Sequence, residues 1–165
     1  MLNRKEGLMV SHKPSDYNCP FCQVVKGIES DKLETRQDDI VHRNDYVTAF
    51  IASSWWPNNK GHVLIVPNEH FENIYELPDE YIYQIHRLEK QIAIALKKVY
   101  QCDGVSSRQH NEPAGDQDVW HYHLHVFPRY DNDNLYACTR MDSSADQRKK
   151  YSKRLRDYFN TERLA

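Results

Sequence analysis

The stretch His121-Tyr122-His123-Leu124-His125-Val126-Phe127 decides the fold, because histidines alternate in it with large apolar or aromatic residues. Successive side chains of an extended strand point to opposite faces. The three histidines would then share one face, and Tyr122, Leu124 and Val126 would pack into a core on the other. A helix would scatter the same residues, because its period is 3.6. The sequence therefore predicts a strand that ends at Pro128, which lacks a backbone N–H.

Three imidazoles on one strand face indicate one of two kinds of site. Neutral imidazole is a common metal ligand. Imidazole also titrates near neutral pH and can form a covalent intermediate, which suits nucleophilic and acid–base chemistry. A sheet face that merely tolerates histidine would mix residue types, so strict alternation argues against it. The residues alone leave both functional alternatives open.

The whole chain has 165 residues and a formal net charge of −2. This length suits one domain with a sizeable core, and the near-neutral charge makes nucleic acid or a membrane surface an unlikely partner. Residues 1–13 carry no recognisable secretory signal, and no later stretch is apolar enough to span a bilayer. We expect a cytoplasmic protein with a loose arm over residues 1–18 and a single domain over residues 19–165, whose core covers residues 19–130.

Hydrophobic periodicity predicts an α+β fold in which a sheet packs against a long helix. The helix begins near Pro78, and its apolar residues recur at three- and four-residue steps up to Val99, with Gly104 just past its end. A shorter helix is expected over residues 69–75 and a C-terminal helix over about 143–159, capped by Ser143 or Ser144. The remaining strands are predicted over residues 40–42, 46–51, 61–67 and 105–110.

Two loops are candidates for lining a site. Residues 53–60 contain the adjacent Trp55 and Trp56, which either line a pocket or cap the edge of the core, and the sequence leaves both possibilities open. Residues 111–118 form a polar loop rich in turn residues directly before the histidine strand. We expect this second loop to lie beside the site and to hold a ligand.

Cys19 and Cys22 form a C-x-x-C pair. In a cytosolic protein this spacing more often binds a metal or performs redox chemistry than forms a disulfide. A closed structural zinc site takes about four ligands, so the pair would supply half of one. The alternative is two thiols without a metal.

Several blocks together resemble the histidine-triad family of nucleotide hydrolases and transferases. The stretch 121–127 resembles the signature of that family, His-x-His-x-His followed by two apolar residues. Pro128-Arg129 after it is closer to the fragile-histidine-triad and bacterial branches than to the branch that continues with two glycines. Three further blocks match: Gly61-His62 with its apolar strand, Pro67-x-x-His70, and Ala114-Gly115 with Gln117 and Val119. The resemblance covers roughly residues 19–130.

The resemblance implies a twisted antiparallel sheet of about five strands, a long helix and often a homodimer. It also implies attack on the α-phosphorus of nucleoside phosphoramidates or dinucleoside polyphosphates. By analogy His123 is the nucleophile and forms a nucleotidyl-histidine, which water then hydrolyses. His121, His125 and His62 would orient it, bond phosphate oxygens or protonate the leaving group. Nucleotidyl transfer to another acceptor, or nucleotide binding without turnover, are the alternative functions.

The same resemblance assigns ligand-binding roles outside the triad. Gln117, Asn111 and Gly115 would bind the substrate phosphate. The zinc-containing members of the superfamily imply a structural zinc site made of Cys19, Cys22, His70 and His121. A catalytic magnesium is not required, because histidines and amides would supply the charge neutralisation that phosphoryl chemistry needs. No organic cofactor is expected.

The chain departs from the family pattern at two positions. Asp118 stands where the family often has a small hydroxyl residue, and we expect its carboxylate to point away from phosphate or to bond the backbone. Ala52 lies near the position that often supplies an acidic contact to ribose. Asn58, Asn59 or the tryptophan loop would have to replace that contact.

Overall fold

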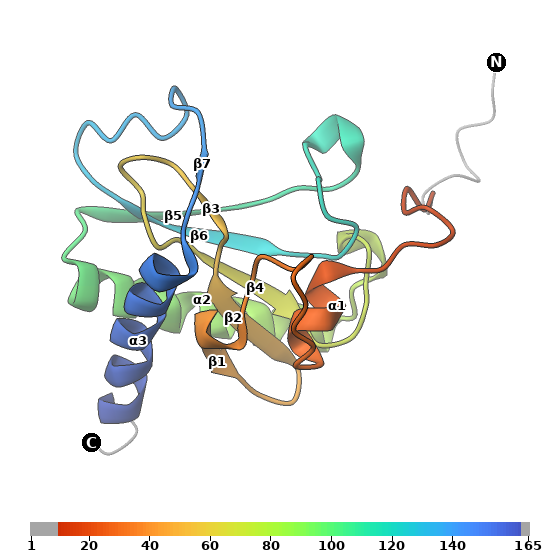
Figure 1. Ribbon diagram of the computed structural model, residues 1–165, viewed down its shortest axis with the longest axis horizontal. Coiled ribbons are helices and arrows are strands. Elements are labelled where there is room, and N and C mark those ends of the chain that lie inside the picture. Colours follow the sequence, from red (N-terminus) through yellow and green to blue (C-terminus); the bar gives the residue numbers. More distant parts are fainter. Residues whose placement is uncertain (1–9, 163–165) are drawn as a thin grey trace.

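The protein is seen in a computed structural model that describes residues 10–162, and a five-stranded antiparallel sheet forms its centre (Figure 1). The strands pair in the order β1-β2-β4-β6-β5. They are β1 (Ile40–Arg43), β2 (Val47–Ile51), β4 (Val63–Pro67), β5 (Gly104–Gln109) and β6 (Leu124–Arg129). The two-residue strands β3 (Ser54–Trp55) and β7 (Met141–Asp142) pair separately. The predicted α+β fold is confirmed.

The alternation predicted for the histidine stretch is confirmed as well. Tyr122, Leu124 and Val126 are buried in the larger of two hydrophobic clusters. The histidines lie on the opposite side, where His123 and His125 line a pocket and His121 contacts Phe21 of the other hydrophobic cluster. Strand β6 begins only at Leu124, so His121 and His123 belong to the segment just before it.

The prediction that the strand ends at Pro128 is wrong by one residue, because β6 continues to Arg129. Pro128 lies opposite Val105 of the edge strand β5. On the other side, the pairing with β4 ends where Val63 faces Val126. The missing N–H of Pro128 therefore interrupts no hydrogen bond with β4.

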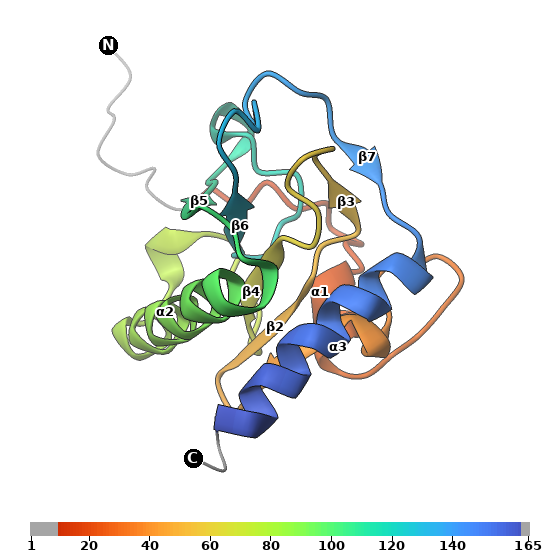
Figure 2. The same cartoon turned by 90° about the vertical axis from the view of Figure 1, so that its left-hand side faces the viewer.

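Helix α2 (Asp79–Tyr100) covers one face of the sheet (Figure 2). The predicted apolar stripe is buried there, with Ile85, Leu88, Ile92 and Leu96 at its centre. The helix ends at Gln101, which adopts the left-handed conformation with φ of 56°. Gly104 is therefore not the terminating residue, and it opens β5 instead.

The short helix of the fold is α1 (Pro20–Val25), which covers the other face of the sheet. Pro20 suits the first helical position, and the Cys19 side chain accepts a hydrogen bond from the Cys22 backbone N–H. The helix predicted over residues 69–75 is wrong. Backbone groups there bond other segments, since the Ile74 N–H donates to Asn111 Oδ1 at 2.9 Å. Only the 3₁₀ turn η2 (Ile74–Glu76) remains.

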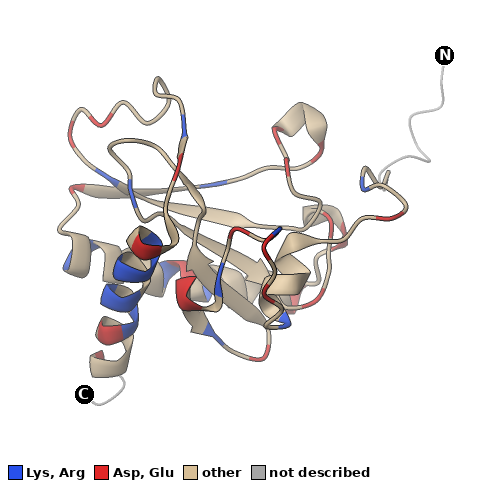
Figure 3. Ribbon diagram, in the orientation of Figure 1, with Lys and Arg blue, Asp and Glu red and all other residues tan. Residues whose placement is uncertain are grey.

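Helix α3 (Ala145–Glu162) confirms the predicted C-terminal helix. Of the two candidate caps, Ser144 accepts a hydrogen bond from the Gln147 N–H. Arg148 is buried and donates to Asp39 at 2.8 Å, in the 3₁₀ turn η1 (Gln37–Asp39), which ties α3 to the domain. Charged residues run along α3, whereas β2 and β4 carry none (Figure 3).

The predicted arm over residues 1–18 falls partly outside the described residues, which begin at position 10. Within the described part, Ser11 donates to Glu72 at 2.6 Å, and the Tyr17 hydroxyl accepts from the Trp120 N–H at 3.1 Å. The domain boundary at residue 19 stays a prediction. In residues 10–162 no helix is long and apolar enough to cross a membrane.

Candidate active site

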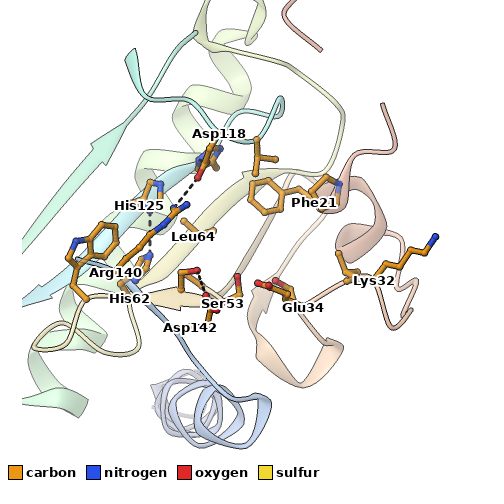
Figure 4. Close-up of a pocket in the computed structure, with 18 residues that line it drawn as sticks. Phe21, Lys32, Glu34, Ser53, His62, Leu64, Asp118, His125, Arg140 and Asp142 are labelled. Atoms are coloured by element: carbon orange, nitrogen blue, oxygen red, sulfur yellow. Dashed lines mark hydrogen bonds and ion pairs between the residues drawn. The ribbon is translucent and has the colours of Figure 1, made fainter. Parts of the chain in front are cut away.

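Three of the four predicted catalytic histidines line a cavity of about 480 Å³ on the α1 side of the sheet (Figure 4). Strands β4 and β6 supply the floor, because period-two alternation directs every second side chain of each strand to this face. The segment before β4 contributes His62, and β6 contributes His125. Phe21 from α1 and Arg140 from the segment after β6 close the sides.

The His123 ring is held in one orientation. Its Nδ1 lies 2.8 Å from the backbone carbonyl oxygen of His121, which can only accept, so Nδ1 carries the proton and Nε2 the lone pair. The edge contact with Phe21, at 5.3 Å between ring centroids, fixes the ring further. Burial lowers the pKa of His123, so the imidazole is neutral at pH 7. A neutral, oriented imidazole with a free lone pair can act as a nucleophile.

His62 and His125 lie beside each other next to this nucleophile candidate. Their Nε2 and Nδ1 atoms are 3.4 Å apart, and the rings stack on Phe127. Burial, aided by nearby cations, lowers the pKa of His62 to about 3. Burial also holds the pKa of His125 well below its usual range. Both rings are uncharged at neutral pH, and because one ring donates its N–H to the other, the pair offers one free ring N–H to a phosphate without carrying a buried charge.

Asp118 does not point away from the pocket, contrary to expectation. One carboxylate oxygen lies 3.9 Å from His123 Nε2, and the other accepts from Arg140 at 3.0 Å. Figure 4 shows the ion pair across the pocket mouth. The sequence argument failed because it considered repulsion by substrate phosphate, and the free protein places a guanidinium there.

The three predicted phosphate-binding residues lie beside this cavity and are not among the residues that line it. Gln117 is buried, where it donates to the carbonyl oxygens of Glu72 and Val119 and accepts from the Glu112 N–H. Asn111 is bonded to Gln109 and Ile74. Gly115 ends the 3₁₀ turn η3 (Pro113–Gly115). Their role in binding stays a prediction.

The two adjacent tryptophans in the loop over residues 53–60 have different roles, one packing in the core and the other lining the pocket. Trp55 is buried in the core, and its indole N–H donates to the Ala52 carbonyl at 2.8 Å. Trp56 lines the cavity. Asn58 and Asn59 instead bond the segment around Asp133, so they anchor the loop. Asp142, which also lines the cavity, accepts a hydrogen bond from Ser54 at 3.3 Å.

The four predicted metal ligands come together behind the active strand. The ligand atoms of Cys19, Cys22, His70 and His121 all lie within 4.8 Å of one another. His121 Nδ1 is 3.3 Å from Cys19 Sγ and 3.5 Å from Cys22 Sγ. In a tetrahedral zinc site, bond lengths of about 2.0–2.3 Å separate neighbouring ligand atoms by about 3.5 Å. His121 Nε2 donates to the Pro67 carbonyl at 3.0 Å, which leaves Nδ1 free to coordinate. The cluster could bind a metal.

Sequence reasoning missed Phe21, Arg108 and Arg140. Phe21 sits inside the C-x-x-C motif, and its contact with His123 has no local signal. Arg108 lies opposite His125 in the β5–β6 register, so alternation on β5 could have indicated it. Arg140 follows an irregular segment, and no period in the sequence points to it.

Comparisons with known proteins agree with this architecture. The family model of the HIT domain matches residues 34–132. The protein hit of Bacillus subtilis is 35% identical over 114 residues, which cover 68% of this chain and 72% of the relative. Adenosine 5'-monophosphoramidase HNT1 of Saccharomyces cerevisiae is 32% identical over 118 residues, which cover 70% and 65%.

Among solved structures, a zinc-bound histidine triad family protein from Mycobacterium smegmatis superposes with a TM-score of 0.72. The match covers 89% of this chain and 96% of that chain. At 22% identity, this likeness shows the fold.

Proposed function

This chain belongs to the histidine-triad (HIT) family, and from that premise we propose that it is a nucleotide hydrolase. It attacks the α-phosphorus of nucleoside phosphoramidates or dinucleoside polyphosphates. The observation that carries the proposal is the His123 ring, whose Nδ1 is tied to the His121 carbonyl while Nε2 faces the cavity. That a yeast relative is an adenosine 5'-monophosphoramidase supports the substrate class. The Pro128-Arg129 ending supports the bacterial and fragile-histidine-triad branches.

The reaction proceeds in two displacements at phosphorus. The Nε2 lone pair of His123 forms a bond to the α-phosphorus while the bond to the leaving group breaks. Water then hydrolyses the resulting P–N bond and releases the nucleoside monophosphate. Dividing the reaction in this way replaces one difficult step with two easier ones.

The neighbouring histidines stabilise the phosphate through hydrogen bonds. The hydrogen-bonded pair of His62 and His125 offers one free ring N–H, and its hydrogen bond strengthens as negative charge develops on the phosphate oxygens. Nδ1 of His62 has no hydrogen-bond partner among the described residues, so it is available for a ligand oxygen or water. His121 holds His123 through its carbonyl oxygen and acts as a positioning residue.

The test compares wild type with His123→Ala on adenosine phosphoramidate and diadenosine triphosphate side by side. We expect a loss of at least about a thousandfold in turnover, with nucleotide binding retained, because the nucleophile alone is removed. His86→Ala, an exposed histidine on α2, serves as the matched control and should turn over normally. Full activity of His123→Ala would refute the mechanism.

Two alternatives are separated by the same assay. Nucleotidyl transfer uses the same intermediate, and added acceptors would then increase product formation above the rate in water. A binding module would bind nucleotide without any turnover by well-folded wild type.

The homodimer that the family resemblance implies stays a prediction, which sedimentation of the purified chain would test.

We further propose that Cys19, Cys22, His70 and His121 bind a structural zinc ion. The contact distances of 3.3–3.5 Å suit a tetrahedral site, and the solved relative from Mycobacterium smegmatis is a zinc-bound protein. The ion would tie α1 to the segment before β6 and hold His121 two residues from the nucleophile. Its role there is structural, since four protein ligands leave no open position.

Metal analysis of the purified protein tests the zinc proposal. We expect one zinc per chain in wild type and in Cys138→Ser, whose thiol lies outside the cluster. Cys19→Ser should lose the metal and unfold at lower temperature. Wild type without stoichiometric zinc, together with unchanged stability of Cys19→Ser, would end the proposal.

A further inference from the structure

A second cavity, of about 450 Å³, opens next to the nucleotide pocket and has no role in the function proposed above. The two cavities share Trp56, Asp118, His125 and Arg140, so they meet beside the triad. Its remaining wall includes Arg108 of β5. A group that leaves the α-phosphorus on this side of His125 would enter the second cavity.

Arg108 supplies a cation that has no carboxylate partner. It lies opposite His125 in the β5–β6 register, and its guanidinium stacks on Trp56 and Phe127 at 4.7 and 4.8 Å from the ring centroids. Its Nε is buried without a hydrogen-bond partner, and among the described residues no carboxylate lies within ion-pair distance. A partly buried guanidinium with unused donors binds an anion favourably.

Arg140 supplies a second cation, which is held in an exchangeable pair. Its partner Asp118 is 52% exposed and Arg140 itself is 57% exposed. Exposed ion pairs contribute little to stability, so an incoming anion can take the place of the carboxylate at low cost. Asp118 also lies 3.9 Å from His123 Nε2. Its carboxylate therefore lies close to where a phosphate attacked by His123 would have to sit.

We propose that Arg108 and Arg140 form a subsite for a phosphate-bearing leaving group, so that the chain prefers phosphoanhydrides to phosphoramidates. This inference rests on the proposed function and names its substrate class. As the His123–phosphorus bond forms, the P–O bond to the leaving group breaks, and its electron pair departs with the bridging oxygen. The two guanidinium groups stabilise that developing charge. Water then supplies the oxygen of the monophosphate, releases one proton to solvent and returns the electron pair to Nε2.

Three further residues near the subsite affect how strongly the two cations bind an anion. Asp118 is displaced in the proposal, and Asp116 lies on the rim of the same cavity, where it is exposed. His110 contacts His125 at 5.9 Å between centroids and offers a further ring nitrogen. The two arginines can therefore favour phosphoanhydrides over phosphoramidates only after Asp118 has moved. For this reason, Arg140 is substituted in a protein that already lacks the Asp118 carboxylate.

The kinetic test therefore compares Asp118→Asn with Asp118→Asn/Arg140→Gln, so that removal of Arg140 does not strand a carboxylate beside His123. We expect kcat/KM for diadenosine triphosphate to fall about tenfold, the loss typical of one charge-assisted hydrogen bond. Turnover of adenosine phosphoramidate, whose leaving group is ammonia, should fall much less than that of diadenosine triphosphate in the same pair of variants. Arg108→Gln should show the same selective loss, and Arg87→Gln on the exposed face of α2 should show none. Equal losses on both substrates would overturn the subsite.

A binding measurement keeps the inference independent of turnover. Inorganic triphosphate is titrated into His123→Ala/Asp118→Asn, and the same titration is repeated after Arg108→Gln or Arg140→Gln is added to that background. We expect each arginine substitution to weaken binding about tenfold. If wild type hydrolyses neither substrate while the arginines still govern triphosphate binding, the proposed function fails and the anion subsite stands. Undiminished triphosphate binding would overturn the subsite whatever the enzyme hydrolyses.

Discussion

The two walls of the pocket that His123 lines differ in burial and in charge. The strand wall carries His62 and His125, which are buried and uncharged because burial lowers the pKa of each. The loop wall carries Asp118 and Arg140, which are charged and half exposed. Burial makes the first wall a fixed set of neutral hydrogen-bonding groups. Exposure makes the second wall exchangeable, since a solvent-exposed ion pair contributes only about 0–1 kcal/mol.

The largest difference should appear on substitution of the glycine that precedes each wall in the chain. Gly61 precedes β4 with φ of 75°, and a Cβ there would collide with the Tyr151 ring. We expect Gly61→Ala to lower the free energy of unfolding by about 3 kcal/mol, from overpacking and the left-handed backbone. Gly115 lies in the segment that leads to Asp118, and a Cβ there would meet no atom within 4 Å, so Gly115→Ala should change stability little. Urea titration measures both, and similar losses would contradict the contrast.

The pH dependence of stability should reveal the buried histidines. The pKa of His62 is lowered to about 3 by burial among His125, Trp56 and Phe127, with Arg108 and Arg140 as the facing cations. The unfolded chain binds the proton near pH 6.5, so stability is complete above that pH and falls as the pH decreases toward 3.

Between pH 6.5 and 5, His62 alone should cost about 2 kcal/mol. Urea titration of wild type and His62→Gln at the two pH values isolates this contribution, because the variant has nothing to protonate at position 62. Equal losses in the two proteins would show that His62 is not held neutral.

The smallest effect on stability belongs to the loop wall. Arg140→Gln removes an exposed ion pair, and we expect the free energy of unfolding to change by less than about 1 kcal/mol. Thermal and urea unfolding at low and moderate salt provide the measurement. A change of several kcal/mol would mean that the pair is structural, and the exchange of Asp118 for substrate phosphate would then be untenable.

The strand wall could be predicted from sequence because its geometry repeats. A period of two assigns each side chain in residues 121–127 to a face without knowledge of any other segment. The stripe of α2 follows from a period of 3.6 in the same way. The face on which each side chain of a regular strand or helix lies can therefore be predicted from the local sequence alone.

The loop wall could not be predicted, because it depends on contacts between distant segments. Glu112 and Asp116 adopt positive φ angles of 61° and 66°, which nothing in their residue types requires. The side-chain amide of Gln117 donates a hydrogen bond to the carbonyl oxygen of Glu72, 45 positions earlier in the chain. Arg140 reaches Asp118 across an irregular segment. The same dependence on other segments explains why residues 69–75 do not form the predicted helix.

The most direct test of the account is to capture the covalent intermediate. Wild type is mixed with a dinucleoside polyphosphate labelled at the α-phosphorus, quenched in denaturant within one turnover, and its peptides are mapped by mass spectrometry. The account predicts a nucleotidyl group on His123, absent from His123→Ala and present in His86→Ala. Rapid hydrolysis without any adduct, or an adduct on another histidine, would contradict it.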